Sequence, residues 1–465
     1  MKKLVATAIV IAGLAAAGFL ADQAIERDHD YDRLIDLGDD ALSRDQTFVA
    51  IEHYSGAIAL KRGSMLAYLK RGEAHQRRGD TPEMLSSALR DLRTAAALDP
   101  GSTRTLERLG DVNFQLRRYA NAAESYEGYI RLDDHSSEIF YKLALASRGD
   151  GRLARATTAL QQAVKLNPNF HEAHYVLGLC LRDRGQLTEA RAAFDRAITI
   201  SPAFIPAREE LADLYRLEDS DREEIEQLEA LFALDPAKAE RLIAVGLAHL
   251  RAGNRDLAVV TLGRAAELFP DTPNVYAALG QVWLEAAEDW GDPTDLRKAL
   301  EAFERVITET DASSETLGHY GRALVLAGQH ARAEAVLRQA AQRFPTDPEV
   351  LPHFAAVAER LGHLDDARQA LVRYSILVDE DRDEASHAVH IGDLSMQLND
   401  AVSAVAWYQK SETLGTGNAP LLVRLAEAQA KAGHLDQARA TVDRALEQDP
   451  QNTAARGLSV RLQPR

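Results

Sequence analysis

Cysteine is almost missing from this chain of 465 residues, and its scarcity excludes several kinds of chemistry. The single cysteine, Cys180, cannot form a disulfide bond within the chain, and a cysteine-rich metal site is impossible. The scarcity is compatible with an oxidising compartment but does not demonstrate one. Because Cys180 lies between Leu179 and Leu181, we interpret it as a small core residue rather than a nucleophile.

A surplus of positive charge is also lacking. The chain has 54 lysine and arginine residues against 71 aspartate and glutamate residues, a formal net charge of -17 at pH 7. Because binding phosphates needs a cationic face, this balance argues against nucleic acid as a partner. It also disfavours broad docking on anionic lipid.

Catalytic motifs are the third absence. The sequence has no HExxH, GxSxG, P-loop or dinucleotide fingerprint. Two histidine pairs at helical spacing, His171 with His174 and His387 with His390, could each share a metal ion, but zinc sites need three or four ligands. We therefore expect solvated or hydrogen-bonded histidines, no metal, no cofactor and no enzymatic activity.

The N-terminus holds a long apolar run. Two lysines precede an uncharged segment, Leu4 to Ala21, after which acidic residues begin. This length is at the lower limit for a membrane-spanning helix, and the three alanines at 15–17 also fit the cleavage site of a secretory signal. The sequence therefore predicts a signal-anchor or a cleaved signal peptide at 1–21, followed by a linker at 22–30.

Both alternatives give one topology. Lysines hold the N-terminus in the cytoplasm, and the rest of the chain crosses the membrane. In a bacterium, the protein would then lie on the periplasmic side of the inner membrane, anchored through residues 4–21 or soluble in the periplasm after cleavage. A further alternative is that this segment is a buried first helix of the fold. Without a partner, however, a segment this apolar would expose a hydrophobic face to solvent.

What is present in abundance is a repeat. Hydrophobic residues make up 46% of the chain and aromatic residues only 6%, and alanine and leucine, both good helix formers, are common. Prolines at 168, 202, 236 and 270 follow one another at intervals of 34 residues. This period divides residues 31–452 into twelve repeats, which start at 31, 65, 103, 137, 171, 205, 239, 273, 314, 348, 385 and 419.

Three positions of the repeat accept only certain types of side chain. Position 8 is glycine or alanine in every repeat, and position 20 is alanine in every repeat but the sixth, which has Glu224. Position 24 is always apolar, as at Tyr54 and Phe194. Two antiparallel helices that cross closely need small residues at the crossing, and glycines such as Gly185 fit the left-handed cap of the first helix.

These positions resemble the tetratricopeptide repeat family over residues 31–452. Residues 171–204 carry the best match, with Leu177, Gly178, Gly185, Ala190, Phe194, Ala197 and Pro202. The resemblance implies an all-α solenoid, an α-α superhelix of helix-turn-helix repeats. Its concave face would be lined by first helices, where partners bind. Residues 453–465 carry Leu458 and Leu462 at helical spacing and are predicted to form a capping helix.

The resemblance places positions 5, 9 and 12 of each repeat in the groove. Position 12 gives Arg148, Arg182 and Arg216 in three successive repeats, and position 5 gives Tyr141 and Tyr175. Such a ladder would suit an extended peptide with carboxylates, or an anionic polysaccharide. Alternatively, the arginines pair with neighbouring acids such as Asp183 or Glu209.

Leucines extend the predicted groove. A long apolar lining would bind a partner helix or peptide, whereas the alternative is that these leucines pack between first helices. The residues concerned are Leu145, Leu179, Leu247, Leu250 and Leu284.

Two departures from the period complete the candidate sites. The sixth repeat is rich in acids, which could form a hinge, a docking patch for a basic partner or only a solvated helix face; the patch comprises Glu209, Asp213, Glu223 and Glu224. The eighth repeat carries an insertion around Trp290, predicted as an exposed loop residue that either anchors a partner or folds back on its own helix.

Taken together, the sequence predicts a non-catalytic protein-protein interaction scaffold of the bacterial cell envelope. It would organise a membrane-associated assembly, such as one for polysaccharide synthesis or export. The alternatives are a periplasmic chaperone that holds extended clients and an anionic-polysaccharide binder. A clamp of lysine and asparagine that some members of the family use for a C-terminal carboxylate is missing, since Ile35, Asp39, Leu69, Glu73 and Glu107 stand at its positions.

Overall fold

The structure is a computed structural model that describes residues 2–79, 81–309, 312–378 and 384–463. Of residues 2–21, 309 and 416 it describes the backbone alone. Within these ranges the chain forms 25 α-helices, one short π-helical segment and no strand, which confirms the predicted all-α class. The chain divides into an N-terminal unit, Met1–Ser220, and a C-terminal unit, Asp221–Arg465, which we describe separately.

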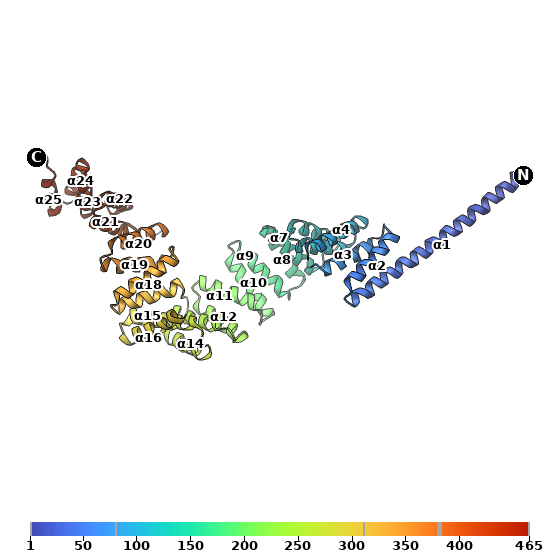
Figure 1. The fold of residues 1–465 in the computed structure, drawn as a ribbon, viewed down its shortest axis with the longest axis horizontal. Coiled ribbons are helices and arrows are strands. Elements are labelled where there is room, and N and C mark those ends of the chain that lie inside the picture. Colours follow the sequence, from blue (N-terminus) through green and yellow to red (C-terminus); the bar gives the residue numbers. More distant parts are fainter. Residues whose placement is uncertain (1, 80, 310–311, 379–383, 464–465) are drawn as a thin grey trace. The chain divides into compact units, whose positions relative to one another are not determined.

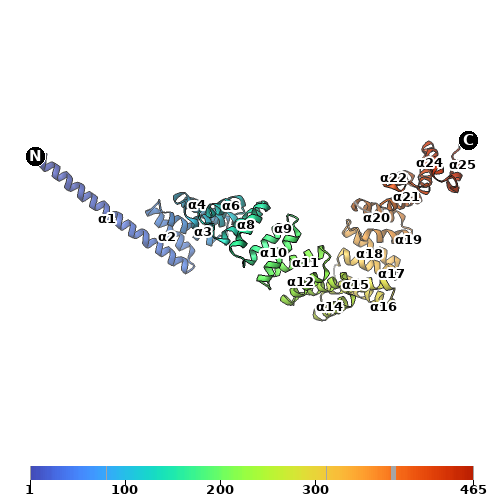
Figure 2. The same cartoon turned by 180° about the vertical axis from the view of Figure 1, so that it is seen from behind.

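The N-terminal unit is a row of helix pairs, shown from two sides in Figure 1 and Figure 2, in which each helix packs on the one before it. The first helices of the pairs are α1 (Lys2–Ser43), α3 (Met65–Arg77), α5 (Thr103–Gln115), α7 (Ser137–Gly149), α9 (His171–Arg182) and α11 (Ile205–Leu217). The second helices are α2 (Thr47–Leu60), α4 (Pro82–Leu98), α6 (Tyr119–Ile130), α8 (Leu153–Leu166) and α10 (Leu187–Ile200).

The C-terminal unit repeats this arrangement and begins with a second helix, α12 (Asp221–Leu234). Its first helices are α13 (Ala239–Arg251), α15 (Pro273–Trp290), α17 (Ser314–Leu326), α19 (Val350–Arg360), α21 (Glu384–Gln397) and α23 (Ala419–Lys431). The second helices are α14 (Arg255–Leu268), α16 (Pro293–Glu309), α18 (His330–Arg343), α20 (Leu364–Leu377), α22 (Ala401–Ser411), which runs into the π-helical segment η1 (Glu412–Thr416), and α24 (Leu435–Gln448). A last helix, α25 (Thr453–Arg461), packs on α23 and α24.

The predicted linker at 22–30 is helical, because α1 runs without interruption from Lys2 to Ser43. No glycine or proline stands between Ala21 and Tyr31, so nothing in this stretch ends a helix. The side chains of the apolar segment, residues 4–21, lie outside the described residues, and the predicted anchor or signal peptide stays a prediction. None of the helices in the described ranges is both long and apolar enough to cross a membrane.

The crossing of the two helices in a pair depends on matched sizes at positions 8 and 24. A Cβ atom added to Gly110 would lie 2.4 Å from the ring of Tyr126, and one added to Gly178 would lie 2.4 Å from Phe194. Both rings are almost completely buried. Wherever position 24 is aromatic, position 8 is glycine, because the ring fills the space that a methyl group would need.

The turn after most first helices uses a left-handed residue. In seven repeats it is a glycine with a positive φ, namely Gly151, Gly185, Gly253, Gly291, Gly328, Gly362 and Gly433. Glycine adopts this conformation without a steric penalty, and it ends the first helix so that the second can fold back. The remaining left-handed residues outside glycine are Asp45, Arg117, Asp219 and Asn399.

Candidate partner-binding surfaces

Charged side chains tie neighbouring first helices together in the N-terminal unit. The carboxylate of Asp39 on α1 accepts hydrogen bonds from the hydroxyl of Tyr54, at 2.7 Å, and from the ammonium of Lys70 on α3, at 2.6 Å. Burial works against the charged carboxylate, but the bonds from Lys70 and Tyr54 outweigh it and lower the pKa of Asp39. The acid of one repeat is thus paired with the cation of the next.

The same pattern recurs around Asp111, where it is denser. The hydroxyl of Tyr126 donates to Asp111 at 2.8 Å, and the ammonium of Lys142 on α7 lies 3.1 Å from the same carboxylate. Lys142 also donates to Glu107 at 2.6 Å. Burial opposes the charge of Lys142, but the bonds to Glu107 and Asp111 raise the pKa of this ammonium. Burial and the nearby Asp111 carboxylate raise the pKa of Tyr126.

A hollow of about 330 Å³ opens beside this network on the first helices α3, α5 and α7. Its wall combines charged, amide and apolar side chains, and Phe114 and Leu145 in it are half-buried. Such a mixture fits a polypeptide segment that brings both apolar and polar groups. The lining residues are Gln76, Asp111, Phe114, Gln115, Tyr126, Lys142 and Leu145.

The arginines of the predicted ladder are paired with carboxylates, which is the alternative prediction that they pair with neighbouring acids. Arg148 lies 3.3 Å from Asp183, and Arg182 contacts both Asp183 and Glu210. Arg216 pairs with Asp213 one helical turn away, at 2.9 Å. Arg148 and Arg182 therefore link neighbouring first helices, and an anionic ligand would have to compete with protein carboxylates for all three guanidinium groups.

The tyrosines beside the ladder pack on other rings. The ring centroid of Tyr141 is 4.9 Å from that of Phe170, and Tyr175 lies 5.3 Å from Phe204 and 5.9 Å from Phe194. Both tyrosines are half-buried, which leaves only part of each ring to a partner. These ring contacts all lie within the tyrosine's own repeat.

The predicted apolar groove of leucines is wrong as a continuous surface. Leu179 and Leu250 are each 7% exposed and Leu284 is 1% exposed, so these three belong to the core between helices. Only Leu145 and Leu247 are half-buried. The period places a residue on a face of its helix, but only the neighbouring helix decides whether that face is covered.

The predicted acidic patch is divided and one of its members is buried. Glu209 and Asp213 are exposed on α11 of the N-terminal unit, whereas Glu223 and Glu224 belong to α12 of the C-terminal unit. Glu224 is 3% exposed and accepts a hydrogen bond from Arg251 at 2.6 Å. A buried carboxylate paired with the partly exposed Arg251 thus replaces the small residue of position 20, and this part of the prediction was wrong.

Trp290 is the last residue of α15 and does not lie in a loop, because the insertion lengthens this helix. Its side chain is 71% exposed, and the guanidinium of Arg255 lies 4.2 Å from its ring centroid. Arg255 is held in turn by Asp289 at 2.6 Å. The ring is therefore stacked on a cation of α14 and keeps one face open to a partner.

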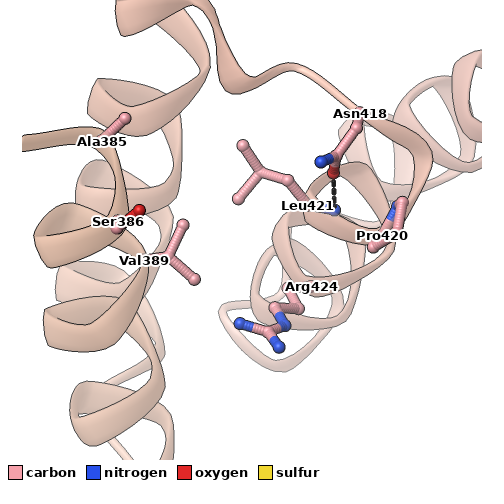
Figure 3. A pocket seen from close by; sticks show the side chains of 7 residues that line it. All are labelled: Ala385, Ser386, Val389, Asn418, Pro420, Leu421 and Arg424. Atoms are coloured by element: carbon pink, nitrogen blue, oxygen red, sulfur yellow. Dashed lines mark hydrogen bonds between the residues drawn. The ribbon is translucent and has the colours of Figure 1, made fainter. Parts of the chain in front are cut away.

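In the C-terminal unit, a recess of about 280 Å³ lies between the first helices α21 and α23. Figure 3 shows Val389 and Leu421 pointing into the space between the two helices, with Arg424 at its edge. The side chain of Asn418 caps α23 by accepting from the backbone N–H of Leu421 at 3.0 Å. The rest of the lining comes from Ala385, Ser386 and Pro420.

Two histidines line a small cavity earlier in the same unit, between the first helices α17 and α19. His319 and His353 stand there with Arg322, whose guanidinium pairs with Glu288 at 2.6 Å. Burial lowers the pKa of both histidines, and the nearby Arg322 adds to the effect. Both are therefore neutral at pH 7.

The remaining reactive side chains are accounted for by local contacts. Burial raises the pKa of the Cys180 thiol, which makes it a poor nucleophile. A ring nitrogen of His174 lies 3.2 Å from the carbonyl oxygen of Pro168, and one of His390 lies 2.8 Å from Glu359. Glu334, His363 and Asp366 come together, but the guanidinium of Arg338 donates to both carboxylates at 2.7 Å.

Sequence reasoning missed the hollow on α3, α5 and α7. A signal for it exists, because an acid at position 9 is followed 31 residues later by a cation, as at Asp39 with Lys70 and Asp111 with Lys142. The regular spacing indicates pairs between repeats. Phe114 and Leu145, which give the hollow its apolar part, carry no comparable signal.

Comparison with known proteins gives two family models, each described as "Tetratricopeptide repeat". One matches residues 85–137 and 141–203, and the other matches 293–351, 324–388 and 395–462. Together these segments cover more than half of the chain.

The curated relatives are matched over a short part of their length. Hsp70-Hsp90 organizing protein 3 of Arabidopsis thaliana is 30% identical over 108 residues, which are 22% of this chain and 19% of that protein. Small glutamine-rich tetratricopeptide repeat-containing protein 2 of Mycosarcoma maydis is 32% identical over 111 residues, 24% of this chain and 30% of that protein. The chain thus spans less than a third of the length of either relative.

Among solved structures, the crystal structure of the yeast Tom70 has a TM-score of 0.41 and 14% identity, and the match covers 80% of this chain and 97% of that one. A crystal structure of MamA protein has a TM-score of 0.36 and 22% identity, over 38% of this chain and 93% of that one.

Proposed function

This chain belongs to the tetratricopeptide repeat family, and we propose on this basis that it is a non-catalytic scaffold that binds segments of other proteins on its first helices. The observation that carries the proposal is the hollow on α3, α5 and α7. It places Phe114 and Leu145 beside the charged pair of Asp111 and Lys142, which suits an amphipathic segment.

Crosslinking from inside the hollow tests this function. A photoreactive amino acid at Gln76 or at Gln115, both in the lining, should capture the same small set of proteins, identified by mass spectrometry. The matched control is the same amino acid at Gln161, an exposed residue of the second helix α8 that lines neither hollow. Equal capture from Gln161, or none from the lining, would contradict the proposal.

We further propose that the scaffold works in the bacterial cell envelope, on the periplasmic side of the inner membrane. The support is the sequence of the N-terminus, in which two lysines, the apolar run of residues 4–21 and an acidic flank follow one another. Alkaline extraction of membranes and N-terminal sequencing of the isolated protein decide between an uncleaved anchor and a mature chain that starts after Ala17. Recovery of an intact chain in the cytosol would overturn the location.

Within the envelope, the proposed task is to hold together a membrane-associated assembly, such as one for polysaccharide synthesis or export. This rests on resemblance to repeat proteins of such systems. A pull-down from detergent extract should then return a fixed set of membrane proteins in constant ratio, and a set that changes with growth conditions would speak against it.

A chaperone function is the second candidate, because the curated relatives include proteins named as organizing proteins of Hsp70 and Hsp90. Against it stands the missing clamp, since Asp39 and Glu73 are acids that pair with Lys70 and Arg104. A holding chaperone would prevent the aggregation of unrelated unfolded proteins in stoichiometric amounts. A scaffold would leave their aggregation unchanged.

A further inference from the structure

A second hollow lies on the other helices of the N-terminal unit, along α4 and at the start of α6. It has a volume of about 640 Å³ and is walled by three arginines together with small and hydroxyl side chains. No carboxylate is among the described residues that line it. The lining comprises Ser86, Leu89, Arg90, Arg93, Thr94, Ala97 and Arg118.

The three arginines of this hollow have no acidic partner in the described ranges. Arg90 makes one hydrogen bond to the hydroxyl of Ser87 at 3.3 Å, and Arg93 and Arg118 are exposed without an ion pair. Of the two acids on the same helix, Asp91, which directly follows Arg90, is 6% exposed and bound through both oxygens by Arg71, at 2.7 Å each. It therefore does not neutralise its neighbours.

Other repeats carry the opposite charge at the same positions. Arg90 and Arg93 occupy positions 22 and 25 of the second repeat, counted from Ala88 at position 20. The third repeat has Glu124 and Glu127 there, and Glu127 pairs with Arg155 of the next repeat. The positions are thus suited to pairs within the solenoid, and the second repeat does not use them in this way.

The residue before Arg118 adds a second, independent observation. Arg117 adopts a left-handed conformation with φ 56°, at position 15 of the repeat, where six other repeats have a glycine with a positive φ. The other exceptions are aspartate or asparagine, which tolerate this conformation, whereas a long side chain there is strained. Arg117 directly precedes Arg118, which lines the hollow, and a non-glycine residue held in a strained conformation next to a candidate site points to a task for its side chain.

We propose that Arg90, Arg93, Arg117 and Arg118 form a binding surface for an acidic segment of a partner polypeptide, separate from the first-helix hollow. Guanidinium groups bind carboxylates through two parallel hydrogen bonds. Charge complementarity favours such a segment, because these cations have no acidic partner among the described residues, although the chain as a whole has a net charge of -17. A short acidic segment fits the local cationic hollow, whereas a continuous polyanion such as RNA would also meet the surrounding acids, including Glu83 and Glu124.

The binding test uses the full chain and a short fluorescent peptide of alternating glutamate and serine. Fluorescence anisotropy should show binding that weakens as the salt concentration rises. The variant R90E/R93E/R118E should bind at least about tenfold more weakly. Because all three side chains are exposed, its circular dichroism and melting midpoint should match those of the wild type.

A matched control makes the same change of charge elsewhere on the N-terminal unit. Lys165, Arg184 and Arg196 are exposed and have no ion-pair partner among the described residues, and K165E/R184E/R196E alters the net charge equally. This control should lose less than about twofold in affinity, since general repulsion between exposed charges is screened. An equal loss in both variants would show that net charge alone attracts the peptide, and would overturn the proposal.

Further probes separate the ligand classes. A peptide of alternating glutamine and serine should not bind, and inorganic phosphate or vesicles with phosphatidylglycerol should not displace the glutamate peptide. Binding of the vesicles without binding of the peptide would show a lipid surface instead. Crosslinking from Gln115 should be unchanged in the triple variant, so that a failure here is distinguishable from a failure of the first-helix site.

The variant R117G isolates the strained residue. Glycine removes the strain, so the melting midpoint should rise, while the peptide should bind about threefold more weakly because one cation is lost. A variant that gains stability but loses affinity supports a retained binding role for Arg117. Unchanged affinity would remove Arg117 from the proposed surface.

Discussion

The two units of the molecule place different side chains at position 6 of their first helices. In the N-terminal unit, α3, α5 and α7 carry Lys70, Arg108 and Lys142, and each contacts an acid of the preceding first helix. In the C-terminal unit, α17, α19 and α21 carry histidine at this position, namely His319, His353 and His390.

The two kinds of side chain at position 6 differ in how their charge depends on pH. A lysine or arginine keeps its charge at every physiological pH, whereas a histidine changes its charge between about pH 5 and 8. The first helices α1, α3, α5 and α7 of the N-terminal unit are therefore joined by permanent ion pairs, whereas the C-terminal unit contains His319 and His353, whose burial favours the neutral form by lowering their pKa. The two units should respond differently to mutation and to pH.

The largest effect is expected from Asp111→Ala in the N-terminal unit. The change leaves the hydroxyl of Tyr126 without its acceptor and Lys142 with less compensation, so the unit should lose about 3 kcal/mol of stability. Hydrogen exchange of the backbone amides in α5 to α7 measures the loss.

The control for this change is Asp213→Ala, because Asp213 and its partner Arg216 are both more than half exposed. An exposed pair contributes little, so the loss should stay below about 0.5 kcal/mol. Equal losses in the two variants would mean that the pairs between first helices are no more than surface contacts.

The next effect is a loss of stability in the C-terminal unit as the pH falls from 7 to 5. Burial lowers the pKa of His319 and His353 in the folded state. The unfolded chain then binds more protons below about pH 6.5, so stability is full above this pH and is lost as the pH falls toward the folded-state pKa.

Tryptophan fluorescence during urea unfolding measures this loss, because all three tryptophans belong to the C-terminal unit and two of them, Trp283 and Trp407, pack against the core that contains α17 and α19. The double variant H319N/H353Q should flatten the dependence on pH. A wild-type chain whose fluorescence midpoint is constant between pH 7 and 5 would contradict the role given to the two histidines.

A smaller effect, with the opposite sign, should follow when the N-terminal unit is given a histidine at this position. In K142H the new imidazole would face Glu107 and Asp111, which favour its charged form and raise its pKa. Its contribution is present below about pH 6.5 and is lost as the pH rises through the folded-state pKa, about 1 kcal/mol by pH 8.

Hydrogen exchange of α5 to α7 in K142H at pH 6 and at pH 8, corrected for the intrinsic rate, gives the comparison, with the wild type as the control. If K142H instead gains stability with rising pH, then burial outweighs the carboxylates at this site, and the distinction between the two units would rest on burial alone.

The sequence predicted those features that neighbouring positions of one repeat determine. The pairing of Gly178 with Phe194 follows from size alone, and the left-handed turn at Gly185 follows from the conformational freedom of glycine. Both features depend on residues fewer than twenty positions apart. The all-helical class and the row of pairs therefore came out as predicted.

The sites were less predictable, because they depend on what the next repeat brings. Arg182 is paired because the next repeat brings Glu210. Arg93 has no acidic partner in the described ranges, because the next repeat has the neutral Asn121 at position 19. One repeat later, the residue at position 19 is Arg155, which pairs with Glu127, the equivalent of Arg93. Leu179 is 7% exposed and belongs to the core, which its own helical face does not reveal. Free charges become visible only when each is compared with its equivalent in the other repeats.

The smallest effect concerns a feature that both units share. The group of position 9, position 24 and the next position 6 is Asp111, Tyr126 and Lys142 in one unit and Asp393, Tyr408 and Arg424 in the other. In both, a buried tyrosine donates to the acid, at 2.8 and 2.7 Å. The variants Y126F and Y408F remove one hydroxyl each without changing the packing of the ring.

Each of these variants should lose about 1 kcal/mol, because the carboxylate keeps its cation and only one neutral donor is removed. Hydrogen exchange of the helices around each site measures both losses, and they should agree within about 0.5 kcal/mol. Equal losses would show that the tyrosine–acid pair is equivalent in the two units, which leaves the residues at position 6 of the other repeats as the difference between them. A much larger loss for Y126F would instead show that the denser network around Lys142 couples the tyrosine to the ion pairs, and position 6 could then not be considered alone.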